Sequence, residues 1–254
     1  ASQGDANAQY KLGDMYYYGE GVEKDNKKAF EWYEKAFESY KKAASQGDAN
    51  AQYKLGDMYY YEKGVEKDYK KAFEWYEKAA SQGLTIAQYK LGNMYYDGKG
   101  VEKDYKKAFE WYEKVASQGF ADAQINLGNM YYYGEGVEKD SKKAFEWYEK
   151  AASQGDEKAE TTISAIKGDA NAQYELGDMY YYGEGYYYGE GVEKDYKKAF
   201  EWYEKAASQG YADAQYSLGN MYKYGRGVEK DSKKAKKLFK EACDGGHQDS
   251  CKLI

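Results

Sequence analysis

The chain of 254 residues contains 34 tyrosines and no proline, and it carries a formal net charge of −6. The negative charge argues against a nucleic-acid partner, since phosphate contacts normally require a clustered excess of lysine and arginine, and the basic residues here alternate with glutamate and aspartate. No apolar run approaches the roughly 18 residues that a membrane-spanning helix needs, so we expect no membrane insertion.

A 36-residue repeat accounts for almost the whole sequence and is clearest at residues 48–83. Asp48 precedes an apolar face that includes Leu55, which predicts a helix entered through an aspartate N-cap. After the GVEKD segment, Asp68 opens a second helical pattern that Gly83 ends. Two short helices cannot bury their own apolar faces, so successive pairs must stack. We therefore expect an all-α fold, an α/α solenoid.

The repeat resembles the Sel1-like repeat (SLR) family, which is related to the tetratricopeptide repeats. The resemblance rests on the patterns A-x3-LG-x-MY, G-x-GV-x2-D and KA-x2-WY-x-KAA-x-QG. The first pattern recurs at Leu12, Leu55, Leu91, Leu127, Leu176 and Leu218, each followed by glycine. The resemblance implies a right-handed superhelix of antiparallel helix pairs, but it does not identify a ligand.

The first part of the solenoid, residues 1–155, is expected to hold four helix pairs. The sequence opens on ASQG, the end of a second helix, so we interpret it as starting inside the array. In the first pair, KAFEWYE is followed by a near copy, KAFESYK, and seven residues advance a helix by almost two turns. We expect one long helix over 26–45, with the insertion at 37–43 leaving Phe37 and Tyr40 as a partly exposed aromatic edge.

Residues 156–168 interrupt the period with DEKAETTISAIKG. Ala159, Ile163, Ser164 and Ile166 match the Ala, Leu, Gly and Met positions of a first helix. We predict a single helix without its partner, and a kink that divides the chain into two lobes.

Residues 169–254 are expected to form two further pairs and the truncated start of a seventh. In the fifth pair YYYGEG occurs twice in succession, and six extra helical residues would turn the apolar face out of register. We therefore expect 186–191 to leave as a loop, with Tyr186, Tyr187 and Tyr188 as a candidate contact patch. A duplication without function is an equal alternative.

The two cysteines, Cys243 and Cys251, lie at the last helical junction. Their spacing is similar to that of the helix-linking disulfide in the cysteine-rich SLR branch of secreted bacterial proteins. This likeness implies a disulfide and, if the pair is bridged, favours an extracytoplasmic location. Two reduced cysteines are the alternative.

Several motifs suggest enzymes without completing a reaction centre. The G-x-G loops follow helices and lack the Lys-Ser/Thr of a phosphate-binding loop, so a turn is the better interpretation. Ser164 and Lys167 fit the S-x-x-K motif of β-lactamases, but S-D-N and K-T-G are absent. The single histidine, His247, leaves no assembly for Ser-His-Asp or Cys-His catalysis or a His-rich metal site. We therefore expect no enzyme activity, no metal and no cofactor.

The candidate binding site is the face of each first helix opposite its leucine, which lines the concave surface in SLR and tetratricopeptide arrays. Tyrosine offers contact area at low entropic cost, and Asn or Asp can bind a peptide backbone or basic side chains. For any single tyrosine, packing within the core is the more common role. The predicted ladder consists of Asn7, Tyr10, Asp14, Tyr17, Asn50, Tyr53, Asp57, Tyr60, Tyr89, Asn93, Tyr96, Asn171, Tyr174, Asp178 and Tyr181.

These observations predict a non-catalytic scaffold or adaptor that binds a protein or peptide segment, basic in character, in its concave groove. One alternative is the penicillin binding or weak β-lactamase-like activity associated with the cysteine-rich SLR branch. Another is a structural spacer or self-assembling array, so the oligomeric state stays open.

Overall fold

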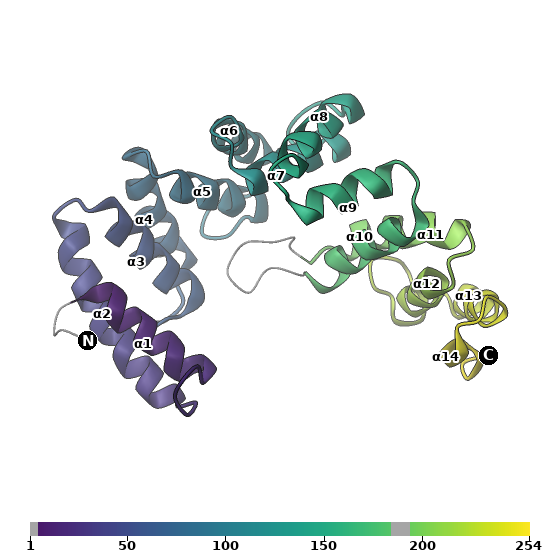
Figure 1. Cartoon of the computed structure of the whole chain (residues 1–254), viewed down its shortest axis with the longest axis horizontal. Coiled ribbons are helices and arrows are strands. Elements are labelled where there is room, and N and C mark those ends of the chain that lie inside the picture. Colours follow the sequence, from purple (N-terminus) through teal and green to yellow (C-terminus); the bar gives the residue numbers. More distant parts are fainter. Residues whose placement is uncertain (1–4, 184–193) are drawn as a thin grey trace. The chain divides into compact units, whose positions relative to one another are not determined.

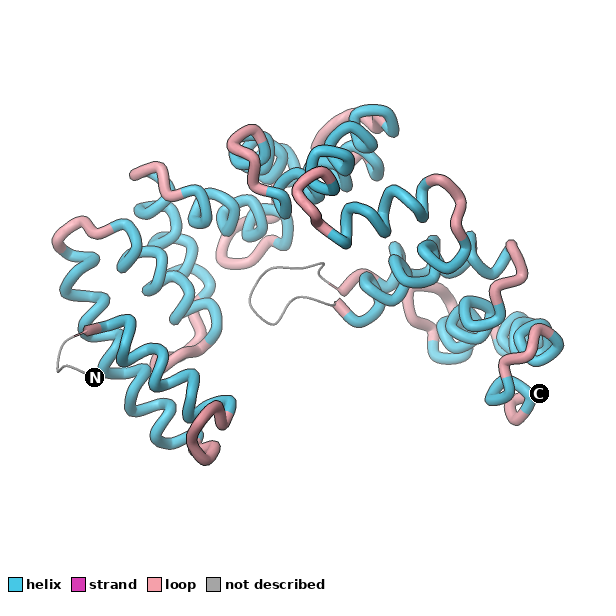
Figure 2. Tube along the Cα trace, in the orientation of Figure 1, coloured by secondary structure: helices cyan, strands magenta, loops and turns pink. Residues whose placement is uncertain are grey.

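The computed structural model describes residues 5–183 and 194–254, and these residues form helices joined by turns, without a strand (Figure 1). Helices adjacent in sequence pack against each other within each compact part of the chain (Figure 2). The helices are α1 (Ala6–Tyr18), α2 (Asn26–Ser45), α3 (Ala49–Tyr61), α4 (Tyr69–Ser81), α5 (Thr85–Asp97), α6 (Tyr105–Ala116), α7 (Ala121–Tyr133), α8 (Ser141–Ala152), α9 (Glu157–Ile166), α10 (Ala170–Tyr182), α11 (Tyr196–Ser208), α12 (Ala212–Tyr224), α13 (Ser232–Asp244) and α14 (Gln248–Cys251). The expected all-α fold of stacked helix pairs is confirmed.

The chain divides into two compact units, Ala1–Asp140 and Ser141–Ile254. The first unit holds α1 to α7 and the second holds α8 to α14. The insertion at 156–168 therefore lies inside the second unit, and the kink expected there stays a prediction. The expected loop at 186–191, with its three tyrosines, lies outside the described residues.

Four helix pairs, α1–α2, α3–α4, α5–α6 and α10–α11, are held together by a tyrosine lock, in which a second-helix tyrosine packs on a first-helix glycine. A Cβ atom added at Gly56 would lie 2.5 Å from the ring of Tyr76, so only glycine leaves room for the ring. The Tyr76 hydroxyl donates to Asp57, the residue after the glycine, at 2.8 Å. The same arrangement joins Tyr33 to Gly13 and Asp14, Tyr112 to Gly92 and Asn93, and Tyr203 to Gly177 and Asp178.

Successive pairs are joined by a buried glutamine that the sequence analysis did not single out. Gln88 of α5 donates from Nε2 to the carbonyl of Ala80 in α4, at 3.1 Å. Gln52, Gln124, Gln173 and Gln215 make the same bond to the alanine eight residues earlier. Each bond satisfies a carbonyl at the end of one helix from within the next, so it fixes the turn between pairs.

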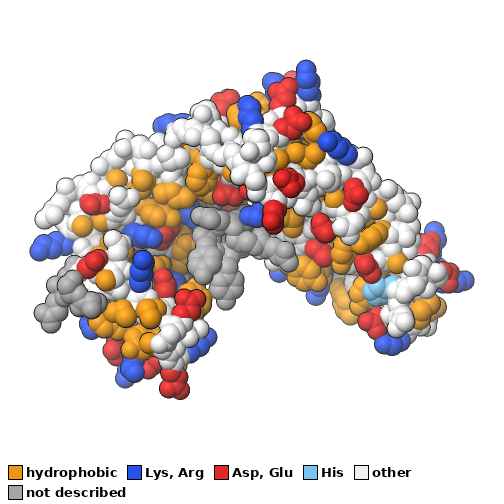
Figure 3. Space-filling view, in the orientation of Figure 1, with side chains coloured by type: hydrophobic (Ala, Val, Ile, Leu, Met, Phe, Trp, Pro, Cys, Tyr) orange, Lys and Arg blue, Asp and Glu red, His pale blue; other side chains and the backbone are white. Residues whose placement is uncertain are grey.

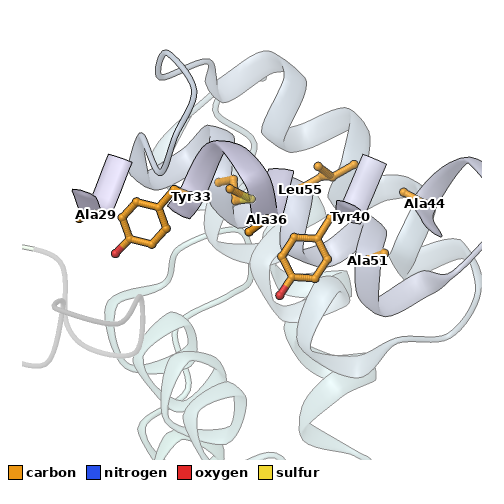
Figure 4. Packing of buried hydrophobic residues seen from close by; sticks show 8 residues of the cluster. Ala29, Tyr33, Ala36, Tyr40, Ala44, Ala51 and Leu55 are labelled. Atoms are coloured by element: carbon orange, nitrogen blue, oxygen red, sulfur yellow. The ribbon is translucent and has the colours of Figure 1, made fainter. Parts of the chain in front are cut away.

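The long helix predicted over 26–45 is confirmed, because α2 spans those residues without a break. The prediction for its aromatic edge is wrong for Tyr40, whereas Phe37 is partly exposed as expected but packs on the next pair instead of overhanging it. Tyr40 is buried and donates to Oδ1 of Asn7 at 2.8 Å, and Phe37 packs on Tyr59 of α3 with ring centroids 5.5 Å apart. The exposed ring is Phe30 of the first copy, which is 47% exposed. Figure 4 shows Tyr33 and Tyr40 projecting from the same side of α2.

Phe30 is exposed and Phe37 is packed because the second pair docks further along α2 than the regular repeat predicts. In the later pairs the equivalent contacts join Phe73 to Tyr95 and Phe109 to Tyr131, each at 5.4 Å between ring centroids. In the first pair the duplicated phenylalanine makes this contact, seven positions after Phe30. The second pair therefore packs about 10 Å further along α2, at 1.5 Å per residue. The insertion keeps the helix face but moves the neighbouring pair.

The helix predicted within the insertion is present as α9, but its buried face differs from the predicted one. Ala159 is buried as expected, whereas Ile163 and Ile166 are partly exposed and Ser164 is exposed. The helix starts like a first helix, since its N-cap Asp156 has a φ of −79°, close to the −66° of Asp48 and unlike the −148° of Asp68. It ends like a second helix, since its Ala165 carbonyl accepts from Gln173 of α10 at 3.0 Å. Because α9 packs on both α8 and α10, its buried face follows neither the first-helix nor the second-helix pattern along its whole length.

The tyrosine lock predicts an unusual cost for a change that normally favours helix. Gly56→Ala should destabilise the first unit by roughly 2 kcal/mol, because the methyl overlaps the Tyr76 ring in a packed interface. Denaturation in urea would measure the loss. In a Tyr76→Ala background the same change should stabilise by up to about 1 kcal/mol, the difference in helix propensity. Stabilisation by Gly56→Ala in the otherwise unchanged protein would contradict the lock.

Candidate functional site

The predicted ladder residues differ widely in accessibility. Asp57 and Tyr89 are buried, at 7% and 1% exposure. Exposed members are Asn7, Tyr17, Asn50 and Asn171. Half-buried members are Tyr10, Asp14, Tyr53, Tyr60, Asn93, Tyr96, Tyr174, Asp178 and Tyr181. The structure therefore makes only part of the predicted ladder accessible.

Aspartate and asparagine at the lock position are acceptors for the second-helix tyrosines. Asp57 is enclosed by Tyr76 and Tyr53, and burial raises the pKa of its carboxyl although Lys90 and Lys54 act in the opposite direction. Asn93 accepts from Tyr112 at 2.7 Å without burying a charge. The choice of Asp or Asn at this position therefore changes the charge of the lock, while the hydrogen bond from the tyrosine is kept.

Three tyrosines in the second turn of a first helix, Tyr10, Tyr89 and Tyr174, are covered by an aromatic residue from further along the chain. The N-cap residues of α7 and α12 are Phe120 and Tyr211, whose side chains make no capping hydrogen bond. Phe120 packs on Tyr89 at 5.0 Å between ring centroids, and Tyr211 packs on Tyr174 at 5.4 Å. In the first pair the inserted Tyr40 lies over Tyr10, at 6.3 Å. At the start of α7 and α12, an aromatic ring that packs on an earlier tyrosine thus takes the place of a capping aspartate.

The ladder tyrosines in the last turn meet a charged residue from the loop of the next pair. Lys63 lies over the Tyr17 ring at 4.3 Å and Lys99 over the Tyr60 ring at 5.7 Å. Tyr96 donates to Glu135 at 2.6 Å, and Arg226 donates to Tyr181. These loop residues occupy one position of the repeat, directly before the glycine of G-V. Sequence analysis missed them, although this position changes between Lys, Glu and Arg while the GVEKD segment that follows stays constant.

Three carboxylates of α10 and α12, Glu175, Asp178 and Asp213, lie close enough to interact. Burial raises the pKa of the Asp178 carboxyl, and the neighbouring charges of Asp213 and Glu175 raise it further, against the hydrogen bonds from Tyr203 and Tyr174. Asp213 and Glu175 are themselves exposed. Like charges that disfavour one another's ionisation gain from a bound cation. On the face of the molecule in view, acidic and basic side chains are otherwise interspersed (Figure 3).

The cysteines form a disulfide between α13 and α14, with their Cα atoms 4.9 Å apart. His247 lies in the turn that the disulfide closes, stacks on Tyr216 at 4.3 Å between ring centroids, and accepts from the Ser250 amide through Nδ1. This nitrogen is therefore occupied in capping α14. The pairing that the cysteine-rich branch implied is confirmed.

Sequence comparison agrees with the repeat boundaries of the structure from residue 49 on, whereas its first two matches meet within α2. The Sel1 repeat pattern matches residues 6–39, 40–48, 49–84, 85–120, 121–156, 170–211 and 212–247. The chain belongs to the Sel1 repeat family. Its matches leave out residues 157–169, where α9 stands in the array.

Known Sel1 repeat structures resemble the chain along most of its length. A protective antigen of uropathogenic Escherichia coli strains with an SLR fold is 32% identical, with a TM-score of 0.54, over 99% of this chain and 66% of the antigen's chain. This chain thus spans slightly less than two thirds of that antigen. A Sel1 repeat protein from Oxalobacter formigenes is 33% identical over 96% of this chain and 88% of that one, with a TM-score of 0.48. Among curated proteins, none matches the sequence.

The cysteine-rich branch is represented by Helicobacter pylori cysteine rich protein B. It is 28% identical over 60% of this chain and 96% of that chain, with a TM-score of 0.31, too low for a structural argument. Ser164 of the S-x-x-K motif lies on the exposed side of α9. Within residues 5–183 and 194–254, no group of three or more His, Cys, Asp or Glu side chains is arranged to hold a metal ion. No helix of these ranges has the length and apolar character to cross a membrane.

The raised pKa of Asp178 predicts a stability that depends on pH. Below the ordinary aspartate pKa of about 4 the carboxyl is neutral in both the native and unfolded chain, and its burial carries no charge penalty. The penalty develops as the pH rises from that value through the raised native pKa. Asp178→Asn, which keeps an acceptor for Tyr203, should therefore stabilise the second unit by roughly 0.5 kcal/mol at pH 7 and by nothing near pH 3. Urea denaturation at both pH values would measure the gain, with Glu204→Gln at an exposed position as the control. A gain of the same size at both pH values would show that burial of the charge is not its cause.

The disulfide closes a loop of about eight residues, for which chain entropy gives about 2 to 3 kcal/mol. Reduction should therefore loosen α13 and α14 and leave the first unit unchanged, which amide hydrogen exchange can resolve. Thiol titration of the unfolded, unreduced chain should find no free thiol. Two free thiols would rule out the disulfide, and a Cys243→Ser, Cys251→Ser variant should reproduce the reduced protein.

Proposed function

We propose that the protein is a non-catalytic scaffold that binds an extended protein segment bearing lysine or arginine along its first helices. The observation that carries the proposal is the acidic and aromatic surface of α10 and α12, where Glu175, Asp178 and Asp213 lie beside Tyr174. A bound cation would relieve the repulsion among these carboxylates, and the tyrosine ring would pack against its aliphatic stem. Membership of a repeat family related to tetratricopeptide arrays supports a role in protein interaction.

The first unit would contribute contacts of a different kind. Lys54 lies over the rings of Tyr10 and Tyr53, at 5.3 and 5.5 Å, and 4.0 Å from Asp57. The chain's own cation thus packs on the ladder in the way we propose for a ligand. Since Asp57 and Tyr89 are buried, we assign them to supporting the ladder, and assign ligand contact to their half-buried and exposed neighbours.

The disulfide bears on where the protein works. Disulfides persist in oxidising compartments, so the bridge between α13 and α14 supports an extracytoplasmic location. We propose that the partner segment is met there.

Alanine substitution tests the proposed surface once a partner has been isolated by pull-down and mass spectrometry. Tyr174→Ala should cost about 1 to 3 kcal/mol of binding free energy, as truncation of an aromatic anchor does at interfaces. Glu175→Gln should weaken binding at low salt and have little effect at high salt, because exposed charge pairs are screened. Isothermal titration calorimetry at two salt concentrations would measure both.

Phe30→Ala is the matched control, because it truncates an exposed ring on a second helix and should leave binding unchanged. Circular dichroism would establish that each variant keeps its helices. Binding that survives joint replacement of Tyr10, Tyr53 and Tyr174 by alanine in a folded protein would exclude the first-helix surface as the site.

A further inference from the structure

The loop between α3 and α4 departs from the repeat at Glu62 and Lys63. Corresponding loops turn through a left-handed glycine, such as Gly98 at the end of α5. Glu62 takes that place with φ of 60°, and it is the only residue other than glycine with positive φ in the described parts of the chain. This backbone conformation carries a cost for a residue with a Cβ atom. Lys63, which follows directly, has a side chain only 13% exposed.

Lys63 reaches back into the first pair and fills a cage made by Asp14, Tyr17, Tyr18 and Tyr33. Its Nζ donates to Oδ1 of Asp14 at 3.2 Å and to the Tyr33 hydroxyl at 2.7 Å. The same nitrogen lies 4.3, 5.2 and 4.6 Å from the ring centroids of Tyr17, Tyr18 and Tyr33. One carboxylate and three aromatic rings thus surround a single ammonium group, an arrangement that recognises alkylammonium ions.

The cage depends on the shifted docking of the second pair. The backbone next to Gly64 packs against Tyr33, the eighth residue of α2, whereas the equivalent Gly100 packs against Tyr69, the first residue of α4. In the regular register Lys99 bonds Asp97 of its own pair at 3.0 Å and lies 5.7 Å from Tyr60. The seven-residue insertion in α2 therefore lets the loop of the second pair reach the lock of the first.

The cage is open to solvent at Tyr17 and Asp14. Asp14 offsets only part of the cost of burying the Lys63 ammonium. Tyr17 is 41% exposed, and the Asp14 side chain is 33% exposed. Burial lowers the pKa of the Lys63 ammonium, and the charge and hydrogen bond of Asp14 offset that effect incompletely. Release of the loop would rehydrate this ammonium and relax the backbone at Glu62. Both effects favour exchange of Lys63 for a competing ammonium.

We propose that the cage of Asp14, Tyr17, Tyr18 and Tyr33 is a binding site for a lysine side chain, and that Lys63 is its intramolecular occupant. A partner segment engages the first pair by displacing Lys63 with a lysine of its own. The inference rests on the proposed function for the ligand's basic character, and adds a defined site in the first unit and an occupant that competes with the ligand.

Removal of Lys63 should open the site to a fluorescently labelled hexalysine peptide, with binding followed by anisotropy. An occupant that closes the cage in about 90% of molecules weakens apparent affinity about tenfold. Lys63→Ala should therefore bind hexalysine roughly tenfold more tightly than the unchanged protein. Lys63→Arg keeps a cation in the cage and should stay near the unchanged value. Thermal unfolding would confirm that both variants fold.

Two controls separate the cage from the change in net charge. Lys67→Ala removes the same charge from an exposed position of the same loop and should gain little. Adding Asp14→Asn to Lys63→Ala should abolish the gain, while its amide oxygen still accepts from Tyr33 as Asn93 does from Tyr112. No gain in Lys63→Ala, an equal gain in Lys67→Ala, or a gain that survives Asp14→Asn would each overturn the proposal.

The outcomes also distinguish this inference from the proposed function. A tenfold gain in Lys63→Ala together with unchanged partner binding in the joint Tyr10, Tyr53 and Tyr174 variant keeps the cage and rejects the first-helix surface. Loss of partner binding in that variant without any gain in Lys63→Ala keeps the surface and overturns the cage.

Discussion

The tyrosine lock is the interaction on which the rest of the structure depends. Its ring occupies the notch above a first-helix glycine, and its hydroxyl bonds the next residue, as for Tyr76 with Gly56 and Asp57. A short helix pair buries too little apolar surface to be stable alone, so a fixed angle between its helices is needed before pairs can stack. The lock fixes that angle through the ring packed on the glycine and through one hydrogen bond. The last pair keeps only the packing, with the Phe239 ring on Gly219.

The lock also limits what the ladder can bind. Asp57 and Asn93 belong to the predicted ladder, but each accepts a hydrogen bond from a tyrosine of its own pair. The ligand that we propose would therefore contact the remaining oxygen of half-buried carboxylates such as Asp14 and Asp178, or the tyrosines around them. At Asp57 and Asp178 burial raises the pKa of the carboxyl, so a cation bound beside either charge would be stabilised. In the proposed function, stability and recognition therefore depend on the same positions.

The insertions show how a repeat array tolerates irregular lengths. Seven added residues in α2 preserve the apolar face because they span nearly two turns, yet they relocate the next pair and bring Lys63 to the first lock. The single helix α9 joins two neighbours by starting as one helix type and ending as the other. Each irregularity changes which surfaces meet and leaves the helix pairs themselves intact.

The sequence by itself determined the helix pairs, their capping aspartates, the bounds of α2 and the identity of the family, because these follow from local periodicity and from motifs repeated within a few residues. The ladder that it predicts stays a prediction, and the sequence did not indicate which of its members are accessible. Only the tertiary structure decided that Phe37 docks and Phe30 is exposed, that Asp57 and Tyr89 are buried, and that Lys63 enters the cage. The sequence alone does not distinguish which copy, the one with Phe30 or the one with Phe37, contacts the second pair, because the two are nearly identical. The offset at which one pair packs on the next is set by contacts between residues far apart in the chain, and that offset selects between the copies.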